Sequence, residues 1–505
     1  MDVPSLNTIK ENLAFSTFLK QYKERLQDIF TRRLNIDKMS LKRGLPPFAL
    51  KSIMQCKPLS VFIPEEYNGR GGHVSESLSM LETTAYESLP LSLMMGINGA
   101  LFLQPVIRYG DEEVRQNIMN RVLNDEAMGG LMITEPDYGS DALHMQTSYS
   151  ETDDGYHVEG LKHWAGLTGW ADYWLITARE QTKSGRLGRD ISFFIHDNRE
   201  PGIEVEEYYN NLGLYMLPYG KNRINIDVPG AHKLQPDRTG IQMMLDILHR
   251  SRLQFPGMAI GFIRRMLDEA TDHCKDRMVG GQSLINYDQV KERITRLQSY
   301  FTISSAMCAF TSSRTTIEEP VTTMDLSANA IKAYATDMMH EASQSLLQLF
   351  GAKGYRNDHI AGRSLVDSRP FQIFEGSNDI LYQQISESVI KRMRKIGELN
   401  LYRFFSNHDL TDKAGEYVKS SLDITIDPKM AQRKLVQLGK AISRLISLNL
   451  TIELGQRGFN EKLTDHTIQH LKSEIENWLH RYHDMPEPSV VEADSNMNWL
   501  DLMNR

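Results

Sequence analysis

Residues 132–141, Met-Ile-Thr-Glu-Pro-Asp-Tyr-Gly-Ser-Asp, mark the point at which the chain changes from a helical to a β-rich pattern. Short apolar runs follow this stretch and are separated by turn pairs such as Asp154-Gly155 and Pro201-Gly202. Such runs at short spacing indicate strands joined by hairpins. The sequence therefore predicts a small antiparallel β-domain over residues 126–235.

Helical patterns lie on both sides of this β-domain. Residues 1–125 carry apolar residues mostly at helical spacing. Three long runs, 243–277, 288–313 and 328–350, do the same and indicate a bundle over residues 236–400. Residues 401–505 continue as a helical extension. The expected fold class is α+β, with an N-terminal helical domain, a central antiparallel β-domain, a C-terminal four-helix bundle and an extra helical tail.

Composition narrows the functional classes. The 505 residues include 57 Lys plus Arg against 65 Asp plus Glu, a net charge of −8, so no basic field favours nucleic acid or an anionic membrane. The sparse cysteines, Cys56, Cys274 and Cys308, fit a reducing compartment, and we expect a cytoplasmic protein. No stretch is expected to reach the ~20 apolar residues that span a bilayer. Residues 1–34 indicate an amphipathic helix rather than a signal or transit peptide.

The turn at 132–141 and a tryptophan downstream form the first candidate site. The turn combines Thr134 with the pair Gly139-Ser140, and its free backbone N–H groups can bind a flavin edge or a pyrophosphate. Trp164 follows on a predicted strand, where an indole can stack against a flat ring. Each feature taken alone is also typical of an ordinary turn and a core tryptophan.

Glu375 is the candidate general base. It lies just before a helix that Ser377 is predicted to cap and that extends to about residue 394. Phe371, Ile373 and Phe374 flank it, and apolar surroundings raise the pKa of a carboxyl group toward neutral pH, where a base acts. The alternative is a solvent-exposed glutamate favoured by the helix dipole.

Together these motifs resemble the acyl-CoA dehydrogenase family over about residues 45–395. Several motifs in register over that length argue against chance similarity. The matching stretches are Ile-Pro-Glu-Glu-Tyr-Asn-Gly at 63–69, Thr-Glu-Pro-Asp-Tyr-Gly-Ser-Asp at 134–141, Gly-Leu-Lys-His-Trp at 160–164, Asp-Arg at 276–277 before Gly281, Gln348 to Tyr355, Arg363 with Asp367, and Phe-Glu-Gly-Ser-Asn-Asp-Ile at 374–380.

The resemblance implies a flavoenzyme that uses FAD for α,β-dehydrogenation of an acyl thioester on CoA or a carrier protein. Glu375 matches the family base, which removes the α-proton while the β-hydrogen passes as hydride to flavin N5. The backbone N–H of Glu375 and a flavin ribityl hydroxyl polarise the thioester carbonyl. Positions matching the FAD site are Ile133, Thr134, Gly139, Ser140, Trp164, Arg277, Gln348, Gly351 and Ser377. Positions matching the substrate site are Ser140, Arg252, Phe374 and Gly376.

The resemblance also bears on assembly. Arg277, Gln348 and Gly351 match positions that reach the FAD of a neighbouring subunit, which implies a homodimer or homotetramer. An electron-transfer flavoprotein or another acceptor is the implied redox partner. Some relatives hold their base just before the arginine matched by Arg252. Here that position is Ser251, so Glu375 is the only matching base.

The sequence departs from the family pattern after Trp164. The usual Ile-Thr-Asn is Ala165-Gly166-Leu167 here, so a hydroxyl that can bond flavin N5 is missing unless Thr168 replaces it. The turn at 212–215 lacks the usual arginine, and Pro-Tyr-Gly at 218–220 replaces small polar residues. These changes suggest a non-standard substrate, such as a thioester on a carrier protein.

Two alternatives stay open beside the dehydrogenase. An acyl thioester oxidase or flavin monooxygenase on the same fold is motivated by residues 165–167, although monooxygenase-type relatives tend to lack the base. A non-catalytic assembly protein would bind no flavin, and the presence of Glu375, Arg277 and Gln348 argues against it.

The tail beyond residue 400 has no counterpart in shorter family members. Residues 429–450 alternate an apolar side with Lys and Arg, as in a helix that lies on a membrane or a partner. Packing on the bundle or across a dimer is the favoured alternative. His466, His470 and Glu474 share one predicted helix face, a weak metal-ligating pattern, and we expect no metal.

Overall fold

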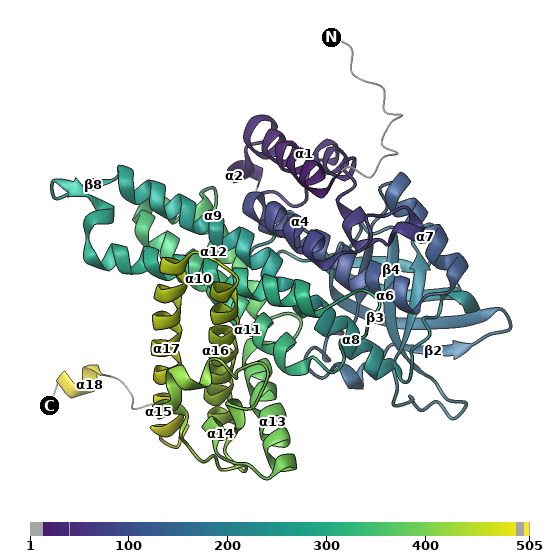
Figure 1. The fold of residues 1–505 in the computed structure, drawn as a ribbon. Helices are drawn as coiled ribbons and strands as arrows, with labels where there is room; N and C mark the ends of the chain where they lie inside the picture. Colours follow the sequence, from purple (N-terminus) through teal and green to yellow (C-terminus); the bar gives the residue numbers. More distant parts are fainter. Residues whose placement is uncertain (1–13, 40, 491–498, 504–505) are drawn as a thin grey trace.

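The computed structural model describes residues 14–39, 41–490 and 499–503. Figure 1 shows the N-terminal helices and the β-sheet on one side of the molecule and the long C-terminal helices on the other. The expected α+β architecture is confirmed, because N-terminal helices, a central sheet, a helical bundle and extra C-terminal helices follow one another along the chain.

The N-terminal part consists of short helices that share one core. The helix expected over residues 1–34 is shorter in the structure, and residues 1–13 lie outside the described residues. The Tyr22 hydroxyl and Thr84 Oγ1, 3.0 Å apart, join the first helix to the fourth. The elements are α1 (Phe15–Gln27), α2 (Ile36–Met39), α3 (Pro47–Met54), α4 (Val74–Glu87), α5 (Leu89–Gly96), α6 (Gln104–Tyr109) and α7 (Glu112–Asn124), with π-helical turns at Asp28–Arg33 and Ile97–Leu103.

One continuous helical stretch, Leu89–Tyr109, is long and apolar enough to cross a membrane by length and composition. The expectation that no stretch reaches this length is therefore wrong. Its most apolar window is 94% buried inside the protein. The stretch supplies core to both the helices and the sheet, since its central turn packs against β1.

The central sheet holds seven strands in the order β1-β4-β2-β3-β7-β6, with β5 paired to β4. The prediction of a purely antiparallel sheet is wrong for β1 and β2, which both pair with β4 in parallel. The long strands β3 and β7, which are far apart in the sequence, pair antiparallel, in agreement with the predicted antiparallel character. The strands are β1 (Gly129–Met132), β2 (Ser148–Glu151), β3 (Gly155–Gly166), β4 (Tyr173–Glu180), β5 (Ser192–Asp197), β6 (Ile203–Tyr208) and β7 (Tyr219–Pro229).

The bundle differs from the prediction at one joint. The single helix expected over 243–277 is two helices that meet at Leu253 and Gln254. The break follows from Pro256, which has no N–H and favours the first turn of a new helix. The helices are α8 (Gly240–Arg252), α9 (Phe255–Asp276), α10 (Asp288–Arg314), α11 (Asp325–Phe350), α12 (Ile360–Ser368) and α13 (Asn378–Ile396), and a short hairpin, β8 (Met278–Val279) and β9 (Gln282–Ser283), joins α9 to α10.

The C-terminal extension packs on the bundle. Its two long helices, α16 (Gln432–Gln456) and α17 (Glu461–His483), contact each other and α10, and α16 also contacts α11 and α13 (Figure 1). The apolar side predicted over 429–450 is buried in these contacts, as the packing alternative requires. The remaining helices of the extension are α14 (Leu401–Phe405), α15 (Lys419–Leu422) and α18 (Leu500–Met503).

A close helix contact yields a stability prediction. A Cβ on Gly261 of α9 would lie 2.1 Å from the backbone oxygen of Glu82 on α4. We expect Gly261→Ala to lower the free energy of unfolding by about 1–3 kcal/mol, because two rigid helices must move apart. Urea unfolding measures the loss. Gly230→Ala is the control, since a Cβ there meets no atom within 4 Å, and equal stability of the two variants would contradict this account of the contact.

Candidate active site

Glu375 lies in a strained turn. The turn connects the 3₁₀ segment Arg369–Gln372 with α13, and it holds Glu375 at φ +53° and the following Gly376 at φ +90°. A left-handed conformation costs a residue with a side chain about 1–3 kcal/mol. Such strain persists only where surrounding groups fix the backbone, and it is typical of functional sites.

Two buried cations fix this turn. Arg252 donates from Nε at 3.1 Å and from Nη2 at 2.9 Å to the backbone oxygen of Glu375, and from Nη1 to Asn329 Oδ1 at 2.7 Å. Lys332 donates from Nζ to the backbone oxygen of Gly376 at 2.8 Å. The carbonyl groups of both left-handed residues are therefore held by charge-assisted hydrogen bonds, which are stronger than neutral ones.

The two oxygens of the Glu375 carboxylate differ. Oε1 accepts a hydrogen bond from Ser251 Oγ at 2.8 Å. Oε2 is buried and has no hydrogen-bond partner among the described residues. Three rings, those of Phe255, Phe371 and Phe374, pack on one another beside the turn with centroids 5.0–6.2 Å apart. One oxygen is thus anchored, and the other is free to take a proton from a bound molecule.

Burial sets the acidity of these groups. Loss of hydration raises the pKa of Glu375, while the hydrogen bond from Ser251 and the charges of Arg252 and Lys332 oppose that rise without cancelling it. Burial also lowers the pKa of Lys332 to about 7. A carboxylate with a raised pKa is the better proton acceptor, so the site suits general-base chemistry.

Trp164 forms an aromatic platform beside this turn. It lies on β3 as predicted, at a bulge where its φ is +56°, and half of its surface is exposed (50%). The Tyr209 ring packs 4.5 Å and the Tyr219 ring 6.2 Å from the indole, centroid to centroid. Burial, and next the charge of Glu375, raises the pKa of Tyr219. Tyr219 thus packs near the indole and also senses the charge of the carboxylate, which lies on the bundle.

The turn at 132–141 is hydrogen-bonded to β3, the strand that carries Trp164. The backbone N–H of His163 donates to the Thr134 oxygen at 2.9 Å. Glu135 accepts from the backbone N–H groups of Gln146 and Thr147 and from the fully buried Lys162 Nζ at 2.9 Å. This buried ion pair fixes the start of the turn next to Trp164, while the region of Gly139 remains open.

Models of one protein family match almost the whole chain up to residue 390. The N-terminal, middle and C-terminal domain models of acyl-CoA dehydrogenase match residues 19–126, 130–225 and 238–390, in that order. The chain belongs to the acyl-CoA dehydrogenase family. It is thus an oxidoreductase of a family that uses FAD and acts on acyl thioesters with an electron acceptor.

Individual relatives have low sequence identity to this chain, but the matches cover most of its length. An acyl-CoA dehydrogenase of Bacillus subtilis is 24% identical over 337 residues, 66% of this chain and 86% of the relative. The structure of an acyl-CoA dehydrogenase complexed with FAD from Bacillus anthracis has a TM-score of 0.76 at 18% identity, over 93% of this chain and 88% of that one. The prolyl acyl carrier protein oxidase AnaB has a TM-score of 0.67 at 18% identity, over 74% of this chain and 98% of that one.

The site of this acyl-CoA dehydrogenase family member fits the family cofactor. A flat ring needs an exposed aromatic surface and free polar groups, and the half-exposed Trp164 indole and the unpartnered Glu375 Oε2 provide both. Open space beside Gly139 fits a ligand at the turn that also carries Ile133, Thr134 and Ser140. Which of these residues touch FAD stays a prediction.

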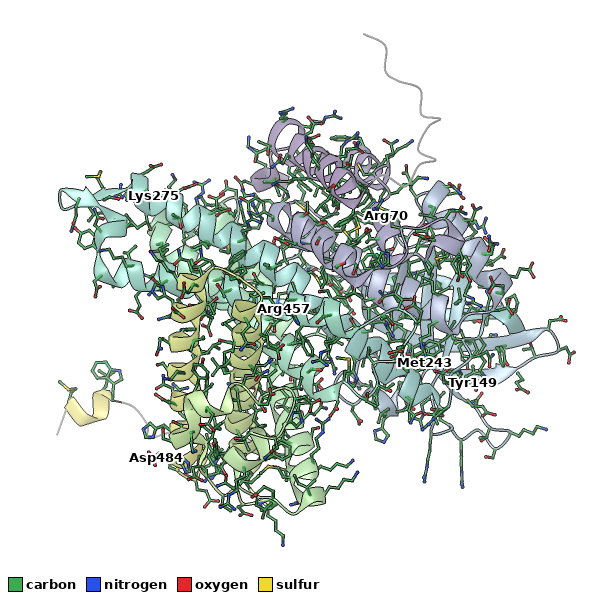
Figure 2. All side chains as sticks on the ribbon, in the orientation of Figure 1. Arg70, Tyr149, Met243, Lys275, Arg457 and Asp484 are labelled. Atoms are coloured by element: carbon green, nitrogen blue, oxygen red, sulfur yellow. The ribbon has the colours of Figure 1, made fainter. Side chains whose placement is uncertain are left out.

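Arg277, Gln348 and Gly351 lie away from Glu375 in the same chain. Helix α9 begins beside the base at Phe255 and has 22 residues, so Arg277 at its end is about 33 Å away along the axis. The ends of α9 and α11 meet there, with the His273 and Phe350 rings 4.0 Å apart. Figure 2 shows Lys275 in this outer region and Tyr149 at the opposite side of the molecule, in the sheet. The use of these residues by a neighbouring subunit remains a prediction.

The structure also gives the contacts of the remaining predicted site residues, Ser377, Arg252 and Thr168. Ser377 begins α13 as expected, but its side chain makes no capping hydrogen bond. Arg252 holds the backbone of the base, and contact with a substrate remains a prediction. Thr168 does not replace the missing hydroxyl after Trp164, because its Oγ1 is fully buried and donates to the Ala165 oxygen at 2.8 Å. A side chain at Gly166 would meet Ile97 Cδ1 at 2.7 Å.

Sequence reasoning missed Lys332 and the ion pair of Glu135 with Lys162. Lys332 is fully buried, in a segment of α11 whose residues from Leu326 to Thr336 are all buried. A lone lysine in such a segment is a signal, because a buried charge needs partners. In the weak metal-ligating pattern of His466, His470 and Glu474, for which we expected no metal, Glu474 accepts hydrogen bonds from Arg444 and Tyr334.

The tight turn makes a testable prediction. A Cβ on Gly376 would lie 3.0 Å from Leu381 and 3.2 Å from Arg252 Nη2, in addition to the left-handed strain. We expect Gly376→Ala to cost about 1–3 kcal/mol more unfolding free energy than Gly397→Ala. Gly397 has φ +73° and no atom near its Cβ position, so it isolates the strain. Equal losses in urea unfolding would show that Arg252 does not constrain the turn.

Proposed function

We propose that the protein catalyses FAD-dependent α,β-dehydrogenation of an acyl thioester, with Glu375 as the base that removes the α-proton. The observation that carries the proposal is the Glu375 carboxylate: one oxygen held by Ser251, the other buried without a partner, and a raised pKa. The sequence match of Glu375 to the family base supports the same assignment.

Each residue of the site has a role in this reaction. Glu375 Oε2 accepts the α-proton, while Ser251 keeps Oε1 in place. The main-chain N–H of Glu375 makes no hydrogen bond within the described residues. In the proposed reaction this N–H donates to the thioester oxygen as negative charge develops there. The phenylalanine rings beside the turn exclude water, which strengthens these interactions. Bound FAD, held at Trp164 and the turn at 133–140, supplies the hydride acceptor for the β-hydrogen.

Assembly and partners follow from the same proposal. The exposed group of Arg277, Gln348 and Gly351 is offered to the FAD of a second copy, which makes the active protein a homodimer or homotetramer. A CoA thioester or a carrier-protein thioester is the substrate. An electron-transfer flavoprotein or another acceptor removes the electrons.

A thioester oxidase is the second candidate. It is favoured by Gly166, which provides no hydroxyl after Trp164, and by Thr168, whose hydroxyl is bonded elsewhere. The fold is shared with an acyl carrier protein oxidase. Peroxide formed in amounts equal to the oxidised thioester would favour the oxidase, whereas a reduced flavin stable in air would favour the dehydrogenase.

The base assignment is tested by Glu375→Gln. The amide cannot accept the α-proton, so we expect flavin reduction by a thioester to slow by at least about 100-fold. Anaerobic bleaching of the flavin across a panel of acyl-CoA and acyl-carrier-protein thioesters measures the rate. Glu341→Gln is the matched control, because burial also raises the pKa of Glu341, which lies outside the site. Full bleaching of the Glu375→Gln protein would remove the base from the mechanism.

The role of Ser251 predicts a shift in pH dependence. Glu375 must be ionised to act, so the rate of flavin reduction rises with pH through the pKa of Glu375. Ser251 stabilises the ionised form, and Ser251→Ala therefore raises this pKa further. We expect the rise of the reduction rate with pH to shift to higher pH by about one unit, while the rate at high pH stays the same. Ser304→Ala, which removes a buried hydroxyl without a partner, is the control. An unchanged pH dependence in Ser251→Ala would contradict the role of Ser251 as the partner of the base.

A further inference from the structure

Arg444 is a buried cation in the C-terminal extension. It lies on α16 with its side chain 2% exposed. Its Nη1 donates to the Tyr382 hydroxyl at 2.8 Å and its Nε to Glu474 Oε2 at 3.1 Å. Its guanidinium carbon lies 3.9 Å from the centre of the Tyr334 ring. A cation in such a place is retained only with a complete set of partners.

A continuous chain of hydrogen bonds connects Arg444 to the turn that carries Glu375. The Tyr382 hydroxyl donates to Asp337 Oδ2 at 2.6 Å, and Asn378 Nδ2 donates to Asp337 Oδ1 at 2.7 Å. Lys332 Nζ donates to Asn378 Oδ1 at 3.0 Å and to the backbone oxygen of Gly376 at 2.8 Å. The chain therefore crosses from α16 through α13 and α11 and ends one residue from the base.

The direction of each bond in this chain is fixed by chemistry. An ionised Asp337 can only accept, so Asn378 must turn its NH₂ group toward it. The amide oxygen of Asn378 then faces Lys332, whose ammonium group can only donate. The Ala333 backbone oxygen also accepts from Asn378 Nδ2, at 3.0 Å. Loss of the Tyr382 or Asp337 end therefore removes one of the bonds that set the amide orientation and loosens the amide, and its rotation would place the NH₂ group against the ammonium. A change at the extension is thus transmitted to the group that holds the Gly376 oxygen.

Helix α16 packs closely against the backbone of α13 at the point where this series of hydrogen bonds passes from one helix to the other. A Cβ on Gly439 would lie 1.9 Å from the backbone oxygen of Tyr382. Ser386 Oγ, one turn farther along α13, donates to the Leu435 oxygen of α16 at 2.7 Å. Helix α16 therefore lies against α13 without an intervening side chain, and Arg444 has little freedom to move away.

We propose that the C-terminal extension is a positioning element of the active site, in which Arg444 acts through Tyr382, Asp337, Asn378 and Lys332 to hold the Glu375-Gly376 turn. The residues of this relay are positioning residues and need not touch the substrate. The inference rests on the proposed role of Glu375 as the base.

Tyr382→Phe and Asp337→Asn test the relay, because both keep the side-chain volume and break one link. Tyr300→Phe is the matched control. Its hydroxyl, like that of Tyr382, is buried against the extension and donates to a carboxylate of α11, in this case Glu341, which does not lead to Asn378. Melting temperature identifies any variant that fails to fold.

Two readouts on the flavin-loaded proteins separate positioning from simple stability. Hydrogen–deuterium exchange of residues 371–378 reports the turn without any substrate, and we expect about tenfold faster exchange in the two relay variants. Anaerobic flavin reduction reports the base, and we expect about a tenfold lower limiting rate with an unchanged dissociation constant for the thioester. Tyr300→Phe should retain wild-type values in both.

The outcomes are distinct. Faster exchange at 371–378 in the relay variants alone, with slower reduction, supports the proposal. Exchange and reduction within about twofold of the wild type, or changed equally in Tyr300→Phe, overturns it. Faster exchange in relay variants of a protein whose flavin no thioester reduces supports the relay and refutes the dehydrogenase function, so the two failures are distinguishable.

Discussion

The whole site depends on one strained turn held by two buried cations. Glu375 adopts a left-handed conformation that a residue with a side chain avoids, and the bonds of Arg252 and Lys332 to the two neighbouring carbonyl groups maintain it. Each cation would be unfavourable in the interior without its acceptors, and each acceptor lies in the turn or its immediate support. The strain and the buried charge therefore stabilise each other, and the carboxylate is oriented as a result.

The joint between α8 and α9 explains how the bundle builds this site. Ser251 and Arg252 lie at the end of α8, and Phe255 lies at the start of α9. Ser251 and Phe255 are four residues apart, a spacing that places side chains on the same side of a helix. The joint at Leu253 and Gln254 keeps both of them, together with Arg252, close to one glutamate, so that a hydroxyl, a guanidinium and an aromatic ring meet there. The sheet then adds Trp164 from a bulge, where the backbone is free to turn an indole outward.

Much of this arrangement could be predicted from sequence, and the rest depends on contacts between distant residues. The helical and alternating periods identify the layers, and the motifs around Glu375 and Gly139 identify the candidate site residues. The parallel pairing of β1 with β4 could not be predicted, because its partners are more than 40 residues apart and neither strand shows a distinctive pattern. Lys332 was missed for a related reason. Its helix has the pattern of a core element, and only the folded structure brings Asn378 and the Gly376 carbonyl to its ammonium group.

The close packing of α16 against α13 has a consequence for folding during synthesis. A chain emerges from the ribosome from its N-terminus, and domains generally fold as they emerge. The sheet and the bundle helices α8 to α13 precede Gly439 and Arg444 in the chain and are made first. Until then the buried edge of Tyr382 and the carboxylate of Asp337 face solvent or a chaperone. Docking of α16 and α17 is therefore a late step in folding, and a chain that has been made only as far as α13 lacks the partners of Tyr382 and Asp337 in the extension.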